Sequence, residues 1–166
     1  MASTAHRLKE AQPIRVLVAD DHPLIRSGLA RLVSAQPDLE LVGTAADGIC
    51  AVEEAERAQP DVIVLDLSMP RLDGVTAAEE IRRKSPQARV LVLSSYVQES
   101  VVISAFNAGV RGYLAKNVSS HEVIEGIRET HAGGIPMSEA IRMMHPHSSL
   151  AEVLTEEADA RADDDR

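Results

Sequence analysis

The sequence predicts an α/β fold, a doubly wound parallel sheet with helices on both of its faces. Five short apolar runs recur along the chain, and stretches with the periodicity of amphipathic helices lie between them. Three of the runs are nearly continuous in Val, Ile and Leu, which is typical of strands buried on both faces of a parallel sheet. Strands that alternate with helices of about 10–15 residues imply right-handed crossovers between parallel strands.

The apolar runs give the expected strands in chain order: 14–19, 39–44, 62–65, 90–93 and 112–115. The helices expected after them are 23–35, 48–58, 74–84, 98–108 and 119–132. Each helix carries apolar residues at helical spacing; those of the fourth are Val101, Val102, Ala105 and Phe106. Ser119 and Glu122 have the spacing of a capping box at the start of the fifth helix.

Composition limits the classes of function. The formal net charge of −9 disfavours a nucleic-acid binder, which needs a basic face, so we expect no direct DNA binding by this chain. The single cysteine, Cys50, cannot form an intrachain disulfide, which fits a cytoplasmic location. No run of about 18 apolar residues occurs, so we expect no membrane partner.

The pattern divides the chain into three parts. Residues 1–12 are expected to be a disordered lead-in, 13–134 a folded domain, and 135–166 a C-terminal extension. The extension is expected to be partly helical, because Ile141, Met143 and Met144 have helical spacing. It then becomes an acidic disordered tail, since residues 152–166 carry seven acids and two bases.

Polar residues follow four of the five expected strands at the point where each ends. They are Asp20, Asp21, Asp66, Ser94, Ser95 and Lys116. Because parallel α/β sheets bind ligands outside the carboxyl ends of their strands, we expect these side chains to converge. Three carboxylates repel one another unless a cation is bound, and Mg²⁺ suits a site of oxygen ligands that also receives a phosphate. A carboxylate can also attack phosphorus, so the cluster predicts phosphoryl transfer to Asp66.

Five motifs carry a resemblance to a known family. They are Asp20-Asp21-His22-Pro23, Asp66-Leu67-Ser68-Met69-Pro70, Asp73-Gly74, the run 90–95 ending in Ser94-Ser95, and Gly112-Tyr113-Leu114-Ala115-Lys116. In this order and spacing the chain resembles the receiver domain of response regulators over roughly residues 13–134. It is most similar to the subfamily with a LuxR-type helix-turn-helix output. The resemblance implies a flavodoxin-like five-stranded sheet of strand order 2-1-3-4-5.

The resemblance also implies a role for each site residue. Asp66 is the phosphoacceptor, served by a sensor histidine kinase. Magnesium is held by Asp20, Asp21, Asp66 and the backbone carbonyl of Ser68. Lys116 pairs with the phosphoryl group, and Ser95 lies beside it. Ser94 is the switch hydroxyl, and Tyr113 is the aromatic side chain that swings inward with it. The expected output is protein binding or homodimerisation through the face of the fourth helix, fifth strand and fifth helix.

Alternative functions remain open at this point. The segment Leu154-Thr155-Glu156-Glu157 looks like the opening of a DNA-binding domain, so the chain is alternatively the receiver part of a transcription regulator that has lost that domain. A phosphatase is disfavoured, because such enzymes need an acid two residues after the nucleophile, where this chain has Ser68. We therefore expect no enzyme beyond slow self-dephosphorylation. His22 is expected to be a loop residue near the site but without chemistry.

Overall fold

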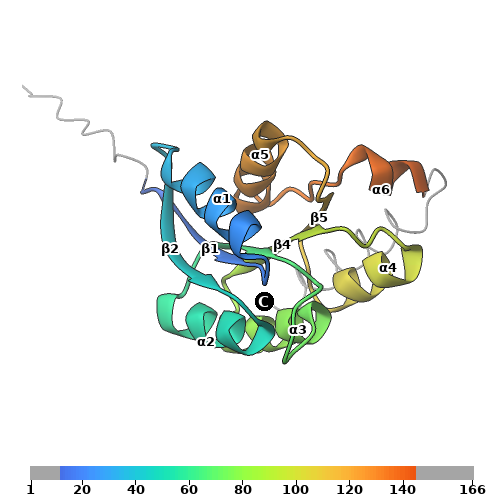
Figure 1. Cartoon of the computed structure of the whole chain (residues 1–166), viewed down its shortest axis with the longest axis horizontal. Coiled ribbons are helices and arrows are strands. Elements are labelled where there is room, and N and C mark those ends of the chain that lie inside the picture. The colour runs from blue at the N-terminus through green and yellow to red at the C-terminus, as the bar shows by residue number, and fades with distance from the viewer. Residues whose placement is uncertain (1–11, 145–166) are drawn as a thin grey trace, which may run out of the picture.

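The computed structural model describes residues 12–144, in which five strands alternate with helices (Figure 1). The strands are β1 (Ile14–Ala19), β2 (Leu39–Ala45), β3 (Val62–Leu65), β4 (Arg89–Ser94) and β5 (Gly112–Ala115). The helices are α1 (Pro23–Ser34), α2 (Gly48–Ala58), α3 (Gly74–Lys84), α4 (Glu99–Asn107), α5 (Ser120–His131) and α6 (Glu139–Met144).

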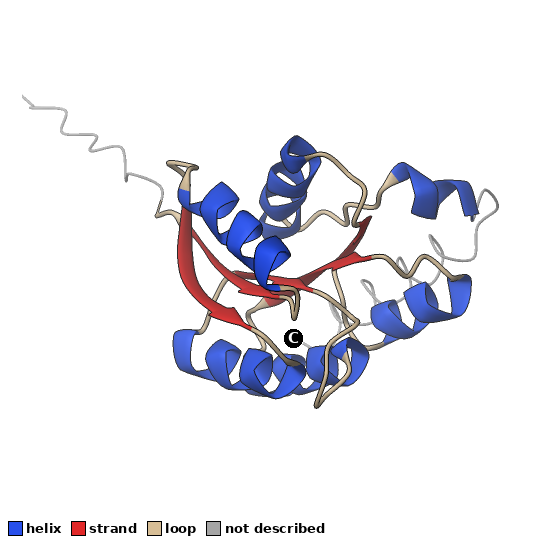
Figure 2. Cartoon of the chain, viewed as in Figure 1, coloured by secondary structure: helices blue, strands red, loops and turns tan. Residues whose placement is uncertain are grey.

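All the strands are parallel and form one sheet in the order β2-β1-β3-β4-β5. The predicted doubly wound, flavodoxin-like sheet and its strand order are therefore confirmed. Helices α1 and α5 cover one face, whereas α2, α3 and α4 cover the other (Figure 2). The order reverses direction between β1 and β3, which places a crevice at their carboxyl ends.

The core lies on both sides of the sheet because successive strand residues point to opposite faces. In β1, Leu17 packs in the cluster beneath α2, α3 and α4, while Val16 and Val18 pack in the cluster beneath α1 and α5. All three side chains are fully buried. This is why the strands are continuous apolar runs and do not alternate between apolar and polar residues.

Three helices begin at capping residues that fix the loops around the sheet edge. The side chains of Asp47, Asp73 and Ser119 accept hydrogen bonds from backbone N–H groups at the starts of α2, α3 and α5. Ser119 Oγ accepts from Glu122 N at 3.2 Å, so one half of the predicted capping box is present. Most element ends match the sequence prediction to within one residue, and Ser94 proves to be the last residue of β4.

Residues 136–144 pack along the free edge of β5. Tyr113 N donates to Pro136 O at 2.9 Å, Ser138 N donates to Tyr113 O at 3.1 Å, and Ala115 N donates to Ser138 Oγ at 3.1 Å. Ile141 of α6 is fully buried in the cluster that contains Phe106. Part of the segment that the sequence analysis assigned to a C-terminal extension thus belongs to the packed core.

Two predicted segments lie largely outside the described residues. The lead-in expected over residues 1–12 is described only at Gln12, and the acidic tail falls within residues 145–166. Among the helices of residues 12–144, none has the length and apolarity needed to cross a bilayer.

Candidate functional site

Backbone hydrogen bonds at the carboxyl ends of the strands position three charged residues. Asp20 N donates to Ala45 O at 3.0 Å, and Asp66 N donates to Ala19 O at 2.9 Å. Lys116 N donates to Ser94 O at 3.0 Å. Each residue therefore continues the hydrogen bonding of the sheet by one step, which aims its side chain into the crevice.

One ammonium group bridges two buried carboxylates in this crevice. Lys116 Nζ lies 3.0 Å from Asp20 Oδ2 and 3.1 Å from Asp66 Oδ2. Both aspartate side chains are 1% exposed, and the lysine side chain is 14% exposed. The other oxygen of Asp66, Oδ1, accepts a hydrogen bond from Ser68 N at 3.1 Å. The structure thus brings Asp20, Asp66 and Lys116 together, as the sequence predicted.

Burial and pairing shift the acid–base properties of the cluster in two ways. Burial raises the pKa of Asp66, although the hydrogen bond from Ser68 and the charge of Lys116 act to lower it. Burial acts to lower the pKa of Lys116, but its hydrogen bonds to Asp66 and Asp20 outweigh burial and raise that pKa. Pairing with the two carboxylates therefore favours the protonated, cationic form of Lys116, whereas burial disfavours the ionised form of Asp66.

His22 lies beside the acid cluster, as expected of a residue near the site, but the sequence analysis did not predict its contacts with two of the carboxylates. Its Nδ1 atom is 3.1 Å from Asp20 Oδ1 and 3.0 Å from Asp21 Oδ1, and its backbone N–H donates to Asp20 Oδ1 at 2.8 Å. The signal in the sequence was the position of His22, which directly follows the two acids and is the residue before α1 begins. The ring thus contacts both carboxylates that the sequence assigned to a metal.

The donor set fits a divalent cation. Ligand atoms of Asp20, Asp21, His22 and Asp66 all lie within 4.8 Å of one another. Among the described residues, Asp20 Oδ2 and Asp21 Oδ1 are buried oxygen atoms without a hydrogen-bond donor of suitable geometry. Buried acceptors of this kind are costly unless a charge neutralises them, and carboxylate oxygens suit hard cations such as Mg²⁺. The acidic pocket could therefore hold a metal ion.

The two predicted switch residues are both buried and share a partner. Ser94 is fully buried, and its Oγ accepts from Tyr96 N at 3.1 Å. Tyr113 is fully buried and packs beside Phe106, with ring centroids 6.5 Å apart, and its hydroxyl donates to the carbonyl oxygen of Tyr96. Burial raises the pKa of Tyr113. The aromatic ring therefore occupies an inward position, whereas Ser95 is exposed.

This arrangement of fold and charged crevice has a known counterpart. Residues 16–128 match the family model of the response regulator receiver domain. The chain belongs to that family. The match includes most of β1, the whole of the other four strands and the acidic crevice, so the predicted resemblance to receiver domains of two-component response regulators is confirmed.

Curated relatives and solved structures agree with this assignment. The nitrate/nitrite response regulator protein NarL of Escherichia coli is 34% identical over 152 residues, which is 92% of this chain and 70% of NarL. The transcriptional regulatory protein LiaR of Bacillus subtilis is 35% identical, covering 82% of this chain and 71% of LiaR. The signal receiver domain of the putative regulator NarL from Mycobacterium tuberculosis has a TM-score of 0.71 at 34% identity, covering 74% of this chain and 98% of that domain.

Proposed function

We propose that Asp66 of this receiver domain accepts a phosphoryl group from a sensor histidine kinase. The observation that carries the proposal is the arrangement around Asp66, whose carboxylate lies at the end of β3 with Lys116 Nζ 3.1 Å from Oδ2. In the transfer, an Asp66 oxygen forms a bond to phosphorus while the bond from phosphorus to the donor histidine nitrogen breaks. Lys116 is positioned to stabilise the negative charge that develops on the phosphoryl oxygens.

Magnesium is the cofactor that goes with this role. Asp20, Asp21, Asp66 and the backbone carbonyl of Ser68 would hold the ion, which when bound neutralises charge on the phosphoryl oxygens. Asp20 and Asp21 supply buried carboxylate oxygens that lie close to Asp66, and such oxygens are suitable ligands for a hard cation. The protein itself orients Asp66 through the Ser68 N–H group.

The phosphoryl group would act as a switch through Ser94 and Tyr113. Ser94 lies at the end of β4 beside the crevice, and Ser95 would flank the phosphate. A new bond from the Ser94 hydroxyl to the phosphoryl group would compete with the bond from Tyr96 N to Ser94 Oγ. That change would move the loop after β4. The loop contains Tyr96, whose carbonyl oxygen accepts the hydrogen bond from the Tyr113 hydroxyl, so Tyr113 would be affected too. Altered protein binding or homodimerisation would be the output.

The chemistry favours an acceptor over a turnover enzyme. A phosphatase with an aspartyl intermediate uses a second carboxyl group, first as general acid for the leaving group and then as general base for water, and Ser68 has no carboxyl group to offer two residues after Asp66. We therefore propose slow self-dephosphorylation only.

The test is phosphorylation by acetyl phosphate in the presence of Mg²⁺, followed by intact mass measurement. We expect one added phosphoryl group on the wild-type chain and none after Asp66→Ala or in the presence of EDTA. Asp38→Asn is the matched control, because Asp38 is a carboxylate outside the crevice whose side chain is 46% exposed. It should be labelled like the wild type.

The opposite results would overturn the proposal. A phosphoryl group that persists in Asp66→Ala would assign the acceptor to another residue. Failure of the wild type both to be labelled and to bind beryllofluoride would indicate a protein-binding module that does not use phosphate.

A further inference from the structure

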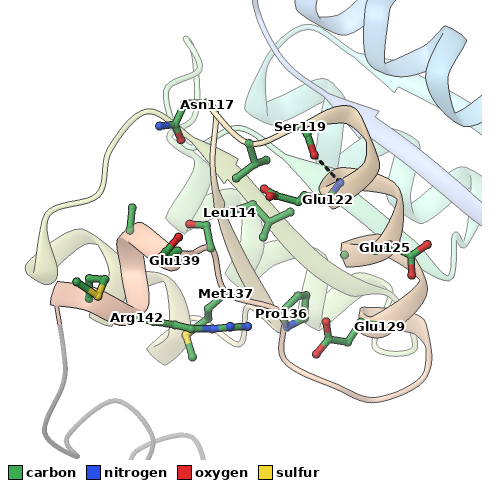
Figure 3. A pocket seen from close by; sticks show the side chains of 15 residues that line it. Leu114, Asn117, Ser119, Glu122, Glu125, Glu129, Pro136, Met137, Glu139 and Arg142 are labelled. Atoms are coloured by element: carbon green, nitrogen blue, oxygen red, sulfur yellow. Dashed lines mark hydrogen bonds between the residues drawn. The ribbon is translucent and has the colours of Figure 1, made fainter.

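A groove of about 660 Å³ runs between α5 and the segment that leads into α6 (Figure 3). One wall is the exposed side of α5, and the other is formed by residues 136–143. Leu114 of β5 lies between Glu122 of the first wall and Glu139 of the second. The groove lies away from the phosphorylation crevice, whose acids do not line it.

The groove combines an apolar floor with an acidic rim. Apolar side chains that line it include Leu114, Val118, Pro136, Met137 and Met143. Met143 is 71% exposed, whereas Leu114 at the floor is 4% exposed, so Met143 is the apolar side chain that the groove presents most openly to solvent. An exposed long apolar side chain beside a hollow is typical of a surface that binds another protein.

The rim carries four carboxylates and one guanidinium. The acids are Glu122, Glu125, Glu129 and Glu139, and the base is Arg142, so the formal net charge of the lining is −3. Among ion pairs within the described residues, Glu125 is matched by Arg128, whereas the other three rim glutamates have no such pair. The groove thus presents a negative charge that the domain itself does not neutralise.

The second wall is fixed to the sheet, which gives the groove a defined shape. Ser138 N donates a hydrogen bond to Tyr113 O, and Ser138 Oγ accepts one from Ala115 N. Ile141 is fully buried and anchors α6 on the opposite side. Because this segment covers the edge of β5, a partner that approaches the predicted output face next to α5 meets the groove and not a bare strand.

We propose that the groove between α5 and α6 binds a basic segment of a partner protein that carries apolar side chains. Lysine or arginine residues of that segment would pair with Glu122, Glu129 and Glu139, while its apolar side chains would contact Met143 and Leu114. Such an amphipathic segment in a groove is a common mode of recognition.

The charge of this chain disfavours two other occupants. Residues 152–166 carry seven acids and two bases, so the chain's own C-terminal residues have the same sign of charge as the rim. A second copy that faced this groove with its own acidic rim would likewise be repelled at this surface. A basic partner has the complementary charge.

The test uses the unphosphorylated full chain, so its result does not depend on Asp66. Binding of a fluorescein-labelled helical peptide of lysine and leucine is measured by anisotropy, beside a glutamate and leucine peptide. We expect Glu122→Gln with Glu139→Gln to weaken binding of the basic peptide, by about two- to five-fold for each carboxylate. The matched control, Glu53→Gln with Glu79→Gln, removes two exposed acids of α2 and α3 and should leave binding nearly unchanged.

A second pair of variants tests the apolar floor. Met143→Ser should weaken binding by about ten-fold, since it removes an apolar contact. Leu24→Ser, which alters an 88% exposed side chain of α1, should not. Equal losses in both charge variants would overturn the proposal, because they would indicate attraction by net charge alone. Equal binding of the acidic peptide, or a dimer that dissociates on Glu122→Gln with Glu139→Gln, would overturn it too.

Discussion

At the residue scale, the crevice balances two buried negative charges against one positive charge. Lys116 contacts Asp20 and Asp66 at 3.0 and 3.1 Å, but it does not fully compensate the desolvation of Asp66. The raised pKa of Asp66 records this imbalance. Buried charges with shifted pKa values of this kind are typical of functional sites.

The imbalance predicts that Asp66→Asn stabilises the protein in EDTA at neutral pH, by roughly 1 kcal/mol, the usual scale of single substitutions. A carboxyl whose pKa is raised by folding stabilises the native state at low pH and loses that contribution as the pH rises through its folded pKa. The advantage of Asn should therefore shrink as the pH falls toward 3.8, the ordinary aspartate value. Urea unfolding at several pH values measures it.

Asp38→Asn provides a control of opposite sign. The hydrogen bond from Arg128 lowers the pKa of Asp38, so this carboxylate contributes stability above its unfolded pKa and loses it as the pH falls. Its replacement should destabilise at neutral pH and have no effect in acid. A stabilising effect of both substitutions would contradict the account given for Asp66.

The acids and the lysine could be predicted from the sequence, because each directly follows a strand and a parallel sheet brings those positions to one edge. The contacts of the His22 side chain could not be predicted from the sequence. Its side chain is 58% exposed, so the rotamer that places Nδ1 between Asp20 and Asp21 depends on packing that no spacing rule encodes.

At the scale of elements, two helical glycines serve different purposes. A Cβ atom on Gly74, at the start of α3, would lie 2.4 Å from Leu67 Cα and 2.7 Å from Asp66 O. The close approach of α3 to the loop after β3 therefore requires glycine. A Cβ atom on Gly28 of α1 would meet nothing within 4 Å. Only one of the two glycines is required by packing.

We predict that Gly28→Ala stabilises the protein by about 1 kcal/mol, because alanine has the higher helix propensity. Gly74→Ala should instead destabilise it by about 2 kcal/mol or more, since backbone atoms beside Asp66 must shift. Urea unfolding of both variants measures the difference. Equal effects would show that α3 can move away from the Asp66 loop without penalty.

The start of α5 was predictable from its cap, because Ser119 and Glu122 have capping-box spacing. Asp47 and Asp73 cap α2 and α3 in the structure, but those starts were predicted from apolar spacing and not from the caps. The ends of the strands were harder to predict than the starts of the helices. Ser94 was expected just beyond the fourth strand, yet it is the last residue of β4 because Ala115 pairs with it. The length of β4 is thus set by its neighbour β5, which single-strand patterns do not reveal.

At the scale of the whole molecule, the domain closes its β5 edge with residues from its own C-terminal side. The backbone of Tyr113 bonds to both Pro136 and Ser138, and α6 follows directly. An exposed strand edge would invite pairing with other chains, and this segment covers it. The sequence predicted a short helix here but not its contact with β5, since the segment lacks a strand-like apolar run.

This closure predicts that Ile141→Ala costs about 3 kcal/mol of stability, as for other fully buried isoleucines. Met143→Ala, in the same helix but 71% exposed, should cost well under 1 kcal/mol. Chemical denaturation of the two variants measures the contrast. A similar small effect for both would mean that α6 is detached in solution.

The bond between the Tyr113 hydroxyl and the Tyr96 carbonyl also makes the protein its own optical probe. The chain has no tryptophan and only these two tyrosines, both beside Ser94. Tyrosine emission therefore arises from the surroundings of Ser94, and near-ultraviolet circular dichroism arises mainly from these two tyrosines and from Phe106, which packs beside Tyr113. A signal that other proteins average over many chromophores here reports, without any label, on one loop and one ring.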